Sequence, residues 1–125
     1  MNTFTATETE FTPLVILNPA EAKYLISGES RPENANKFYE PLLNWFLEFK
    51  KEAKDKKIDF EFKFVYFNST SAKYIMDLLK QFDTLYSEGY PISVRWFYDP
   101  EDEDMKESGE EFAKLVKIPI ELVKE

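Results

Sequence analysis

Three consecutive hydroxyl residues form the stretch of this sequence with the clearest potential for chemistry. Ser69, Thr70 and Ser71 directly follow Asn68, where a strand-like pattern gives way to a helix-like pattern. A hydroxyl at a helix start can accept a hydrogen bond from a free backbone N–H, so we expect Ser69 or Ser71 to cap the helix. A phosphate is also tolerated there, because free N–H groups and the positive end of the helix dipole face it. The residues therefore allow two interpretations, a helix cap alone or a phosphorylation site.

Composition excludes most other chemistry. The 125 residues include neither cysteine nor histidine. The lack of cysteine removes thiolate nucleophiles, disulfides and cysteine zinc sites. The lack of histidine removes the commonest general base, the commonest transition-metal ligand and every Ser-His-Asp triad. We therefore expect no cofactor, no tightly bound transition metal and no enzymatic activity.

Charge and hydropathy indicate a folded, acidic, cytoplasmic domain. Apolar residues make up 43% of the chain and aromatic residues 17%, enough to bury a core in one domain that spans residues 1–125. The net charge of −8 argues against nucleic acid as a partner. The N-terminus lacks the pattern of a secretory signal, and no apolar run is long enough for a membrane span.

The acidic run around Asp102 resembles a calcium loop only superficially. An EF-hand loop that began at Asp102 would place Lys106 and Glu107 where Asp or Asn and Gly are required. Acidic residues in the first turn of a helix complement its dipole without any ligand, and we assign the run to a solvated helix start. Asn68, Ser69 and Thr70 also match the N-glycosylation sequon, which we take as accidental in a chain without a secretory signal.

Hydrophobic periodicity predicts the elements that position the hydroxyl cluster. The order is β-β-β-α-β-α-β-α-β, an α/β fold with one mixed sheet and three helices. The expected strands cover 3–8, 13–17, 23–28, 58–67, 92–98 and 118–123, and the expected helices cover 40–54, 71–87 and 103–116.

Three details of this prediction concern side-chain direction and helix starts. Pro41 suits a first helical turn, so the first helix is expected to begin near Glu40. Strict alternation in 58–67 turns Tyr66 to the same face as Phe64, and turns Val65 and Phe67 to a second face that we expect to be covered near the strand end. The inner side of the third helix is expected to carry Met105, Phe112, Leu115 and Val116.

Five segments carry a resemblance to a known family. They are "TPLVIL", "ISGESRPEN" with "FYEPLLNWF", "VYFNSTSAKYIMDLL", "GYPISVRWFYDPEDEDMKESGEEF" and the closing "IP". Together they span nearly the whole chain, which resembles the SiaC-like family of bacterial regulatory phosphoproteins. The resemblance implies a fold similar to STAS-type anti-sigma-factor antagonists. Arg31 stands where the family often has an aromatic residue.

The resemblance also implies a regulatory site. The phosphoacceptor would be the hydroxyl directly after the Asn, which is Ser69 here, with Thr70 as the alternative; Asn68, Ser71 and Lys73 are assigned to the helix cap and the rim of the partner surface. The implied partners are a kinase related to histidine-kinase ATPase domains, a PP2C-type phosphatase and a diguanylate cyclase that the unmodified protein binds.

The leading hypothesis is a partner-switching protein of bacterial signalling, whose binding is turned off by phosphorylation. One alternative is a constitutive adaptor in which the hydroxyls only cap the helix. A third, from another class, is a small-molecule-binding domain or an enzyme that uses the aromatic sheet and the acids near Asp102.

Overall fold

Six strands form one sheet in which the spatial order of the strands equals their order in the chain. The computed structural model describes residues 2–52 and 55–125. The strands are β1 (Phe4–Ala6), β2 (Leu14–Asn18), β3 (Lys23–Ser30), β4 (Ile58–Phe67), β5 (Ile92–Tyr98) and β6 (Ile120–Lys124), and the helices are α1 (Ala35–Glu52), α2 (Ser69–Ser87) and α3 (Glu103–Leu115). The predicted fold class and element order are confirmed, and β4 and β5 have the predicted bounds.

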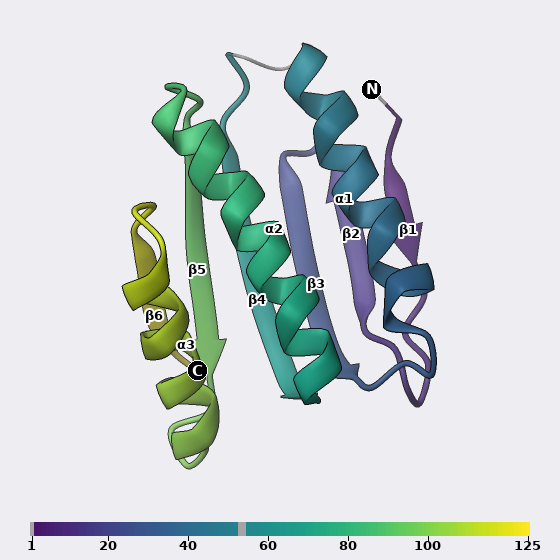
Figure 1. Ribbon diagram of the computed structural model, residues 1–125, viewed down its shortest axis with the longest axis vertical. Coiled ribbons are helices and arrows are strands. Elements are labelled where there is room, and N and C mark those ends of the chain that lie inside the picture. The colour runs from purple at the N-terminus through teal and green to yellow at the C-terminus, as the bar shows by residue number, and fades with distance from the viewer. Residues whose placement is uncertain (1, 53–54) are drawn as a thin grey trace.

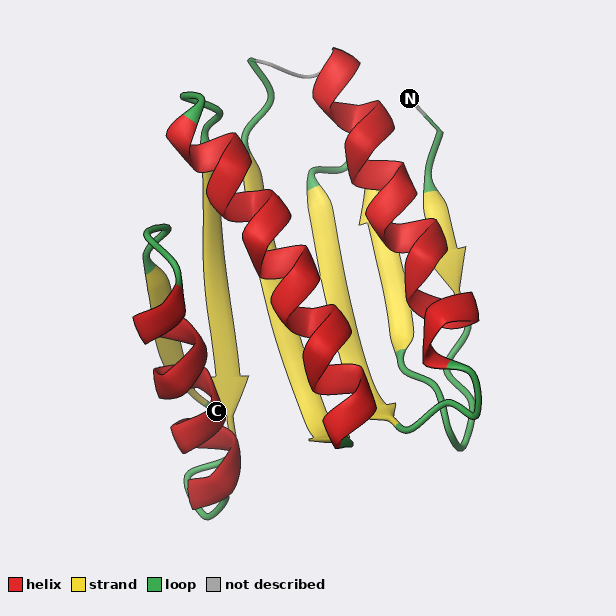
Figure 2. Cartoon of the chain, in the orientation of Figure 1, coloured by secondary structure: helices red, strands yellow, loops and turns green. Residues whose placement is uncertain are grey.

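All three helices lie on one face of the sheet (Figure 1). Strands β1, β2 and β3 pair antiparallel, and β3 to β6 pair parallel, with one helix in each crossover. Parallel crossovers are right-handed, and each one here moves one strand further in the same direction. The helices therefore collect on the same side, and no helix of the described residues covers the other face of the sheet (Figure 2).

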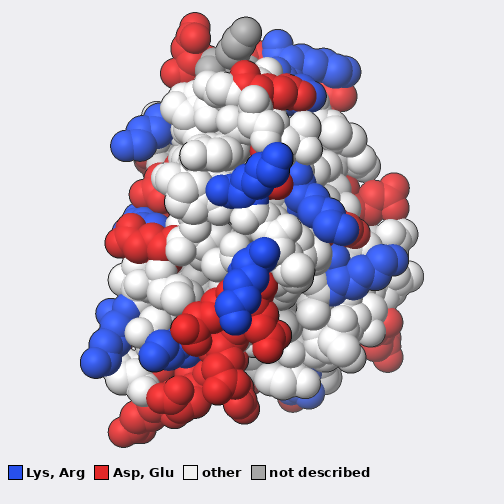
Figure 3. Space-filling view, turned by 60° about the vertical axis from the view of Figure 1, so that its left-hand side comes forward, with Lys and Arg blue, Asp and Glu red and all other residues white. Residues whose placement is uncertain are grey.

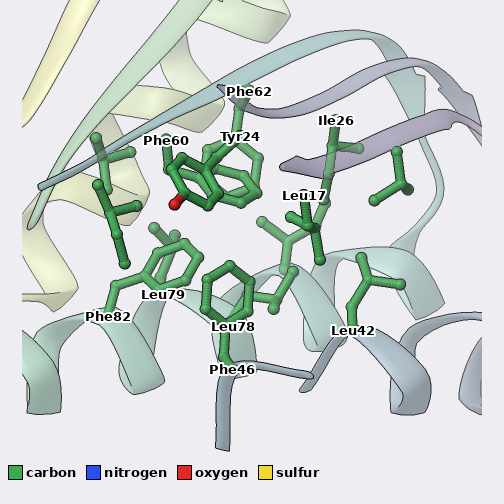
Figure 4. Close-up of a cluster of buried hydrophobic side chains, with 14 of the residues drawn as sticks. Leu17, Tyr24, Ile26, Leu42, Phe46, Phe60, Phe62, Leu78, Leu79 and Phe82 are labelled. Atoms are coloured by element: carbon green, nitrogen blue, oxygen red, sulfur yellow. The ribbon is translucent and has the colours of Figure 1, made fainter. Parts of the chain in front are cut away.

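The core fills the space between the sheet and the helices α1 and α2. Figure 4 shows Phe60 and Phe62 from β4 directed toward Phe46 of α1 and Phe82 of α2. The ring centroids of Phe46 and Phe82 are 4.9 Å apart, and those of Phe60 and Phe82 are 4.8 Å apart. These rings are fully or almost fully buried. Burying each side chain of this size stabilises the fold by about 1.5–3 kcal/mol.

A β-bulge near the end of β4 contradicts the predicted side-chain directions. In the ladder with β3, Gly28 pairs with Phe64 and Glu29 pairs with Tyr66, so Val65 is the extra residue. The bulge reverses the alternation beyond it. Tyr66 is exposed, while Phe67 packs near Phe64, with ring centroids 5.5 Å apart. Val65 is 65% exposed, so the predicted cover over this end of the second face is absent within the described residues.

The starts of α1 and α2 also differ from the prediction, because side chains outside the periodic pattern cap these helices, whereas α3 begins at Glu103 as predicted. The amide of Lys37 donates to Asn34 Oδ1 at 3.0 Å, so α1 begins at Ala35 rather than near Glu40. Pro41 then lies in the second turn, where it removes one helical hydrogen bond. Likewise α2 begins at Ser69, two residues before the predicted start. The predicted end of the first helix at residue 54 lies outside the described residues.

Not every side chain of α3 that was predicted to face inward does so. Met105 and Gly109 are buried, and the ring centroid of Phe112 lies 5.4 Å from that of Trp96. A Cβ at Gly109 would stand 2.5 Å from the Trp96 side chain, so this close approach requires glycine. Leu115, predicted to face inward, is 68% exposed at the helix end, and this detail was wrong.

Candidate functional site at the start of α2

The hydroxyl cluster lies at the end of the molecule where the parallel strands finish. In Figure 1 the carboxyl ends of β3, β4 and β5 and the first turns of the three helices meet at the lower end. Ser69 and Thr70 are exposed there, in the first turn of α2, whereas Ser71 is fully buried. The three hydroxyls therefore differ in whether another protein can reach them.

Asn68, rather than a hydroxyl, caps α2. Its backbone is extended, with φ −85° and ψ 172°, and its Oδ1 atom accepts a hydrogen bond from the amide of Ser71 at 2.8 Å. The prediction that the hydroxyl of Ser69 or Ser71 caps the helix is therefore wrong, because the carboxamide one residue earlier already takes this donor. The first turn still leaves the amides of Ser69 and Thr70 beyond the reach of any helical carbonyl.

Ser71 instead belongs to a buried hydroxyl network with Ser30 and Tyr39. Ser71 Oγ donates to the backbone carbonyl of Ser30 at 3.1 Å, and the amide of Asn68 donates to the same carbonyl at 3.0 Å. Ser30 Oγ lies 2.8 Å from Ser71 Oγ and also contacts the Tyr39 hydroxyl. Since each hydroxyl has one proton, Tyr39 donates to Ser30 and Ser30 donates to Ser71. The network joins the end of β3, the start of α1 and the start of α2.

Burial within this network keeps the Tyr39 hydroxyl protonated. Burial raises the pKa of Tyr39 to about 12, because the anion would lose its hydration, while hydrogen bonding with the serines acts in the opposite direction. Its ring stacks on that of Tyr74, with centroids 5.6 Å apart and planes 5° apart. The phenol therefore stays neutral at physiological pH and holds the two helix starts together.

Sequence reasoning missed Ser30 and Tyr39. Ser30 is the last residue of β3, and its partner Ser71 is 41 residues away in the chain. No local spacing links such positions, since only the parallel pairing of β3 with β4 brings them together. A serine that ends a strand one residue before the exposed Arg31 carries no signal of burial by itself.

Comparison with known proteins identifies the family. The model of the SiaC family regulatory phosphoprotein matches residues 6–125. The chain belongs to this family. An uncharacterized protein of Pseudomonas aeruginosa (strain UCBPP-PA14) is 27% identical over 111 residues, which cover 89% of this chain and 87% of that protein.

Solved structures of the SiaC family share the fold. Apo-SiaC from Pseudomonas aeruginosa is 24% identical, with a TM-score of 0.89 over 98% of this chain and 99% of that chain. A chain in the crystal structure of the diguanylate cyclase SiaD in complex with its activator SiaC, from the same organism, is 24% identical, with a TM-score of 0.92 over 98% and 99% of the two chains.

Two basic residues lie near the phosphoacceptor candidates of this SiaC family member. Lys73 is exposed one helical turn beyond Ser69, and its Nζ atom lies 5.2 Å from the ring centroid of Tyr74. Arg31 directly follows Ser30, and its Nε atom donates to Glu29 at 3.1 Å. Arg31 also lies over the exposed ring of Phe11, 4.8 Å from the centroid. Lys73 is thus on the helix that begins at the cluster, and Arg31 is on the loop that the network anchors.

The acidic segment of this SiaC family chain has a local structural role. Asp99 Oδ1 accepts the amide of Glu101 at 2.8 Å, and Asp102 Oδ1 accepts the amide of Met105 at 3.0 Å. Asp102 is the N-cap of α3, and Glu103 and Asp104 occupy its first turn. Within the described parts of the chain, no group of three or more metal-ligand side chains gathers. None of the helices in those parts is both long and apolar enough to cross a bilayer.

Proposed function

We propose that this chain is a phosphorylation-controlled binding protein in bacterial signalling rather than an enzyme, and that residues 1–125 act as one regulatory unit. Its unphosphorylated form binds and regulates a partner protein. The observation that carries the proposal is the division of the hydroxyl cluster into exposed Ser69 and Thr70 and buried Ser71. A rigid helix start presents the first two to a kinase, and membership of a regulatory phosphoprotein family supports the same role.

Ser69 is the proposed acceptor, and Thr70 is the alternative. Ser69 directly follows the capping Asn68, at the first helical position. A phosphate there meets free backbone amides and the positive end of the dipole, so the fold accommodates it. Ser71 is excluded, because its hydroxyl is buried and bonded to Ser30. Lys73 belongs to the rim of the proposed contact.

The phosphate turns binding off through the cost of burying its charge. It adds about two negative charges at neutral pH to a chain whose net charge is already −8. An exposed ion pair with a basic partner would recover only about 0–1 kcal/mol, whereas removing an ion from water costs several kcal/mol. A net loss of about 3 kcal/mol weakens a complex more than a hundredfold. No change of fold is required.

The proposed partner is a diguanylate cyclase, and the proposed modifying enzymes are a kinase related to histidine-kinase ATPase domains and a PP2C-type phosphatase. The solved complex in which SiaC is the activator of the diguanylate cyclase SiaD supports a partner of this class. The kinase and phosphatase follow from the resemblance to the family. The protein would act in the cytoplasm, where these partners and their nucleotides are present.

Kinase reactions with the full-length protein test the proposal. The cognate kinase should add one phosphate, which peptide mapping should place on Ser69, and titration of the host's cyclase should show binding of the unmodified form alone. Ser69→Ala should abolish the modification and keep binding. Ser87→Ala, an exposed serine at the other end of α2, is the matched control and should behave like the parent.

Two results would overturn parts of the proposal. Phosphate on Thr70 in the Ser69→Ala protein, together with loss of the partner, would keep the switch and move the acceptor. The absence of phosphate on residues 69–71, with equal binding by all variants, would leave the constitutive adaptor as the function.

A further inference from the structure

Beyond the phosphoacceptor, the structure contains an unusual pair of exposed apolar side chains. Val65 and Tyr66 are adjacent in the chain and are 65% and 49% exposed. The β-bulge produces this arrangement, because it turns both residues away from the core that Phe64 and Phe67 enter. Two neighbouring apolar residues on the open face of a central strand are a candidate contact for another protein. They also lie close to the proposed acceptor, since Ser69 is three positions beyond Tyr66 in the chain, a span of at most about 11 Å.

A hollow adjoins this pair where β4 and β5 separate. The β4–β5 ladder ends at Phe62 and Trp96, although β4 continues to Phe67 and β5 to Tyr98. Beyond that point β4 keeps its pairing with β3, and β5 keeps its pairing with β6. The hollow between them has a volume of about 470 Å³, and Val65 forms part of its wall.

The wall of the hollow is suited to a cation with a flat apolar surface. Its apolar part includes Val65, Tyr98 and Phe97, the last of which is only 8% exposed. Its charged part has one cation, Lys63, against four carboxylates, which belong to Asp99, Glu101, Asp102 and Glu125. Figure 3, which brings the β6 side of Figure 1 forward, shows acidic side chains gathered toward the lower end of the molecule.

The chain's own cations already use this aromatic surface. Lys63 Nζ lies 4.5 Å from the centroid of Phe97, and the guanidinium carbon of Arg95 lies 5.3 Å from it. Lys63 Nζ also lies 3.9 Å from Glu125 Oε1, a long ion pair. A guanidinium fits better than an ammonium, because its planar group stacks on a ring and bonds two carboxylate oxygens at once. The described carboxylates do not form a metal-binding group, which leaves a side-chain cation as the complementary ligand.

We infer that Val65, Tyr66 and the adjoining hollow form a docking surface for a partner segment that carries an arginine beside an apolar side chain. The arginine enters the hollow, and the apolar side chain packs on Val65 and Tyr66. The inference rests on the proposed function in taking the occupant to be the regulated protein partner. It adds which face of this chain that partner covers and what chemistry the partner presents.

A peptide titration tests the chemistry of the surface without the cyclase. The probes are acetyl-Leu-Arg-Leu-Arg-Leu-amide and its counterpart with glutamate in place of arginine, added to the ¹⁵N-labelled full-length protein. The arginine peptide should give saturable amide shifts concentrated in residues 63–66 and 98–102. The glutamate peptide should bind about tenfold more weakly or not at all. Equal shifts with both peptides, shifts centred on other residues, or no saturable shift would overturn the inference.

Matched variants test whether the peptide binds this surface rather than any exposed side chain of the same type. Tyr66→Ser should weaken binding of the arginine peptide about tenfold, as expected for the loss of an aromatic anchor. Tyr86→Ser, a tyrosine 42% exposed at the far end of α2, should have no effect. Glu101→Gln should weaken binding, and Glu110→Gln, an exposed acid of α3, should not. Should Tyr66→Ser fail to fold, Val65→Ser compared with Leu115→Ser makes the same test.

The cyclase titration then distinguishes this inference from the proposed function. Binding of the cyclase by the Tyr66→Ser and Val65→Ser proteins at parental strength would overturn the docking surface and leave the proposed function intact. Mapping of the arginine peptide to the surface, with no cyclase bound by the parent protein, would support the surface and overturn the proposed cyclase. Loss of cyclase binding in these two variants, with Ser69 still phosphorylated, would support both.

Discussion

The hydroxyl oxygens of Ser30 and Ser71 lie 2.8 Å apart, although the two residues are 41 positions apart in the chain. This contact gives Ser71 a different role from Ser69 and Thr70. Ser71 fastens the start of α2 to the end of β3, and its two neighbours are left on the surface. A structural residue and the proposed regulatory residues thus share one helical turn.

This division predicts that two neighbouring serine substitutions lower the stability by very different amounts. Ser71→Ala removes the acceptor of the buried Ser30 hydroxyl, so the free energy of unfolding should fall by about 1–3 kcal/mol. Ser69→Ala should change it by less than about 0.5 kcal/mol, because this exposed hydroxyl does not cap the helix. Urea denaturation of both variants measures the difference. A larger loss for Ser69→Ala would contradict the assignment.

Substitution of the cap residue Asn68 should lower the stability only where the new side chain cannot accept a hydrogen bond. Asn68→Ala removes the acceptor of the Ser71 amide and should lower the free energy of unfolding by about 1 kcal/mol. Asn68→Asp retains an acceptor oxygen and should remain near the parent. Thermal unfolding of the two variants, compared with Asn44→Ala on the exposed side of α1, provides the check. Equal losses for the Ala and Asp variants would argue against capping by Asn68.

Tyr39 predicts a loss of stability in alkaline solution. Its pKa rises from 10.0 in the unfolded chain to about 12 in the folded one, so only the unfolded state releases the proton between these values. The contribution of Tyr39 to the free energy of unfolding is therefore complete below pH 10 and is lost as the pH rises toward 12. The loss amounts to about 3 kcal/mol. Denaturation of the parent and of Tyr39→Phe across this range isolates the contribution, because the other alkaline groups titrate in both. Parallel pH profiles would refute it.

An alanine at position 109 should destabilise the fold more than an alanine at position 115. Hydrophobicity alone predicts the opposite order, because Leu115→Ala removes an apolar side chain and Gly109→Ala adds a methyl group. Gly109→Ala places a Cβ against the ring of Trp96 and should destabilise the fold by about 1–3 kcal/mol, despite the higher helix propensity of alanine. Leu115→Ala removes a side chain that is largely in water and should cost less than about 0.5 kcal/mol. Calorimetric unfolding of the two variants measures which one is less stable. A stabilised Gly109→Ala protein would show that α3 moves away from the sheet without cost.

Local patterns in the chain were sufficient to predict β4 and β5. The alternation of aromatic and polar residues in Ile58–Phe67 and Ile92–Tyr98 depends only on the two-residue period of a strand, and both strands have the predicted bounds. Polar residues outside the apolar pattern were the source of error at helix starts. Asn34 and Asn68 cap α1 and α2 through side-chain oxygens, which moves each start earlier than periodicity indicates.

The amino-acid sequence was enough to predict the fold class, the order of the elements and the position of the hydroxyl cluster at a strand–helix junction. These features follow from local periodicity and from segments similar to the family. The tertiary structure decided which hydroxyl is buried, where Tyr66 and Phe67 point, and that one face of the sheet is open. Each of these depends on contacts between distant segments: Ser30 with Ser71, the bulged pairing of β3 with β4, and three crossovers in the same direction. No short-range pattern encodes them, because the partners meet only once the sheet has formed.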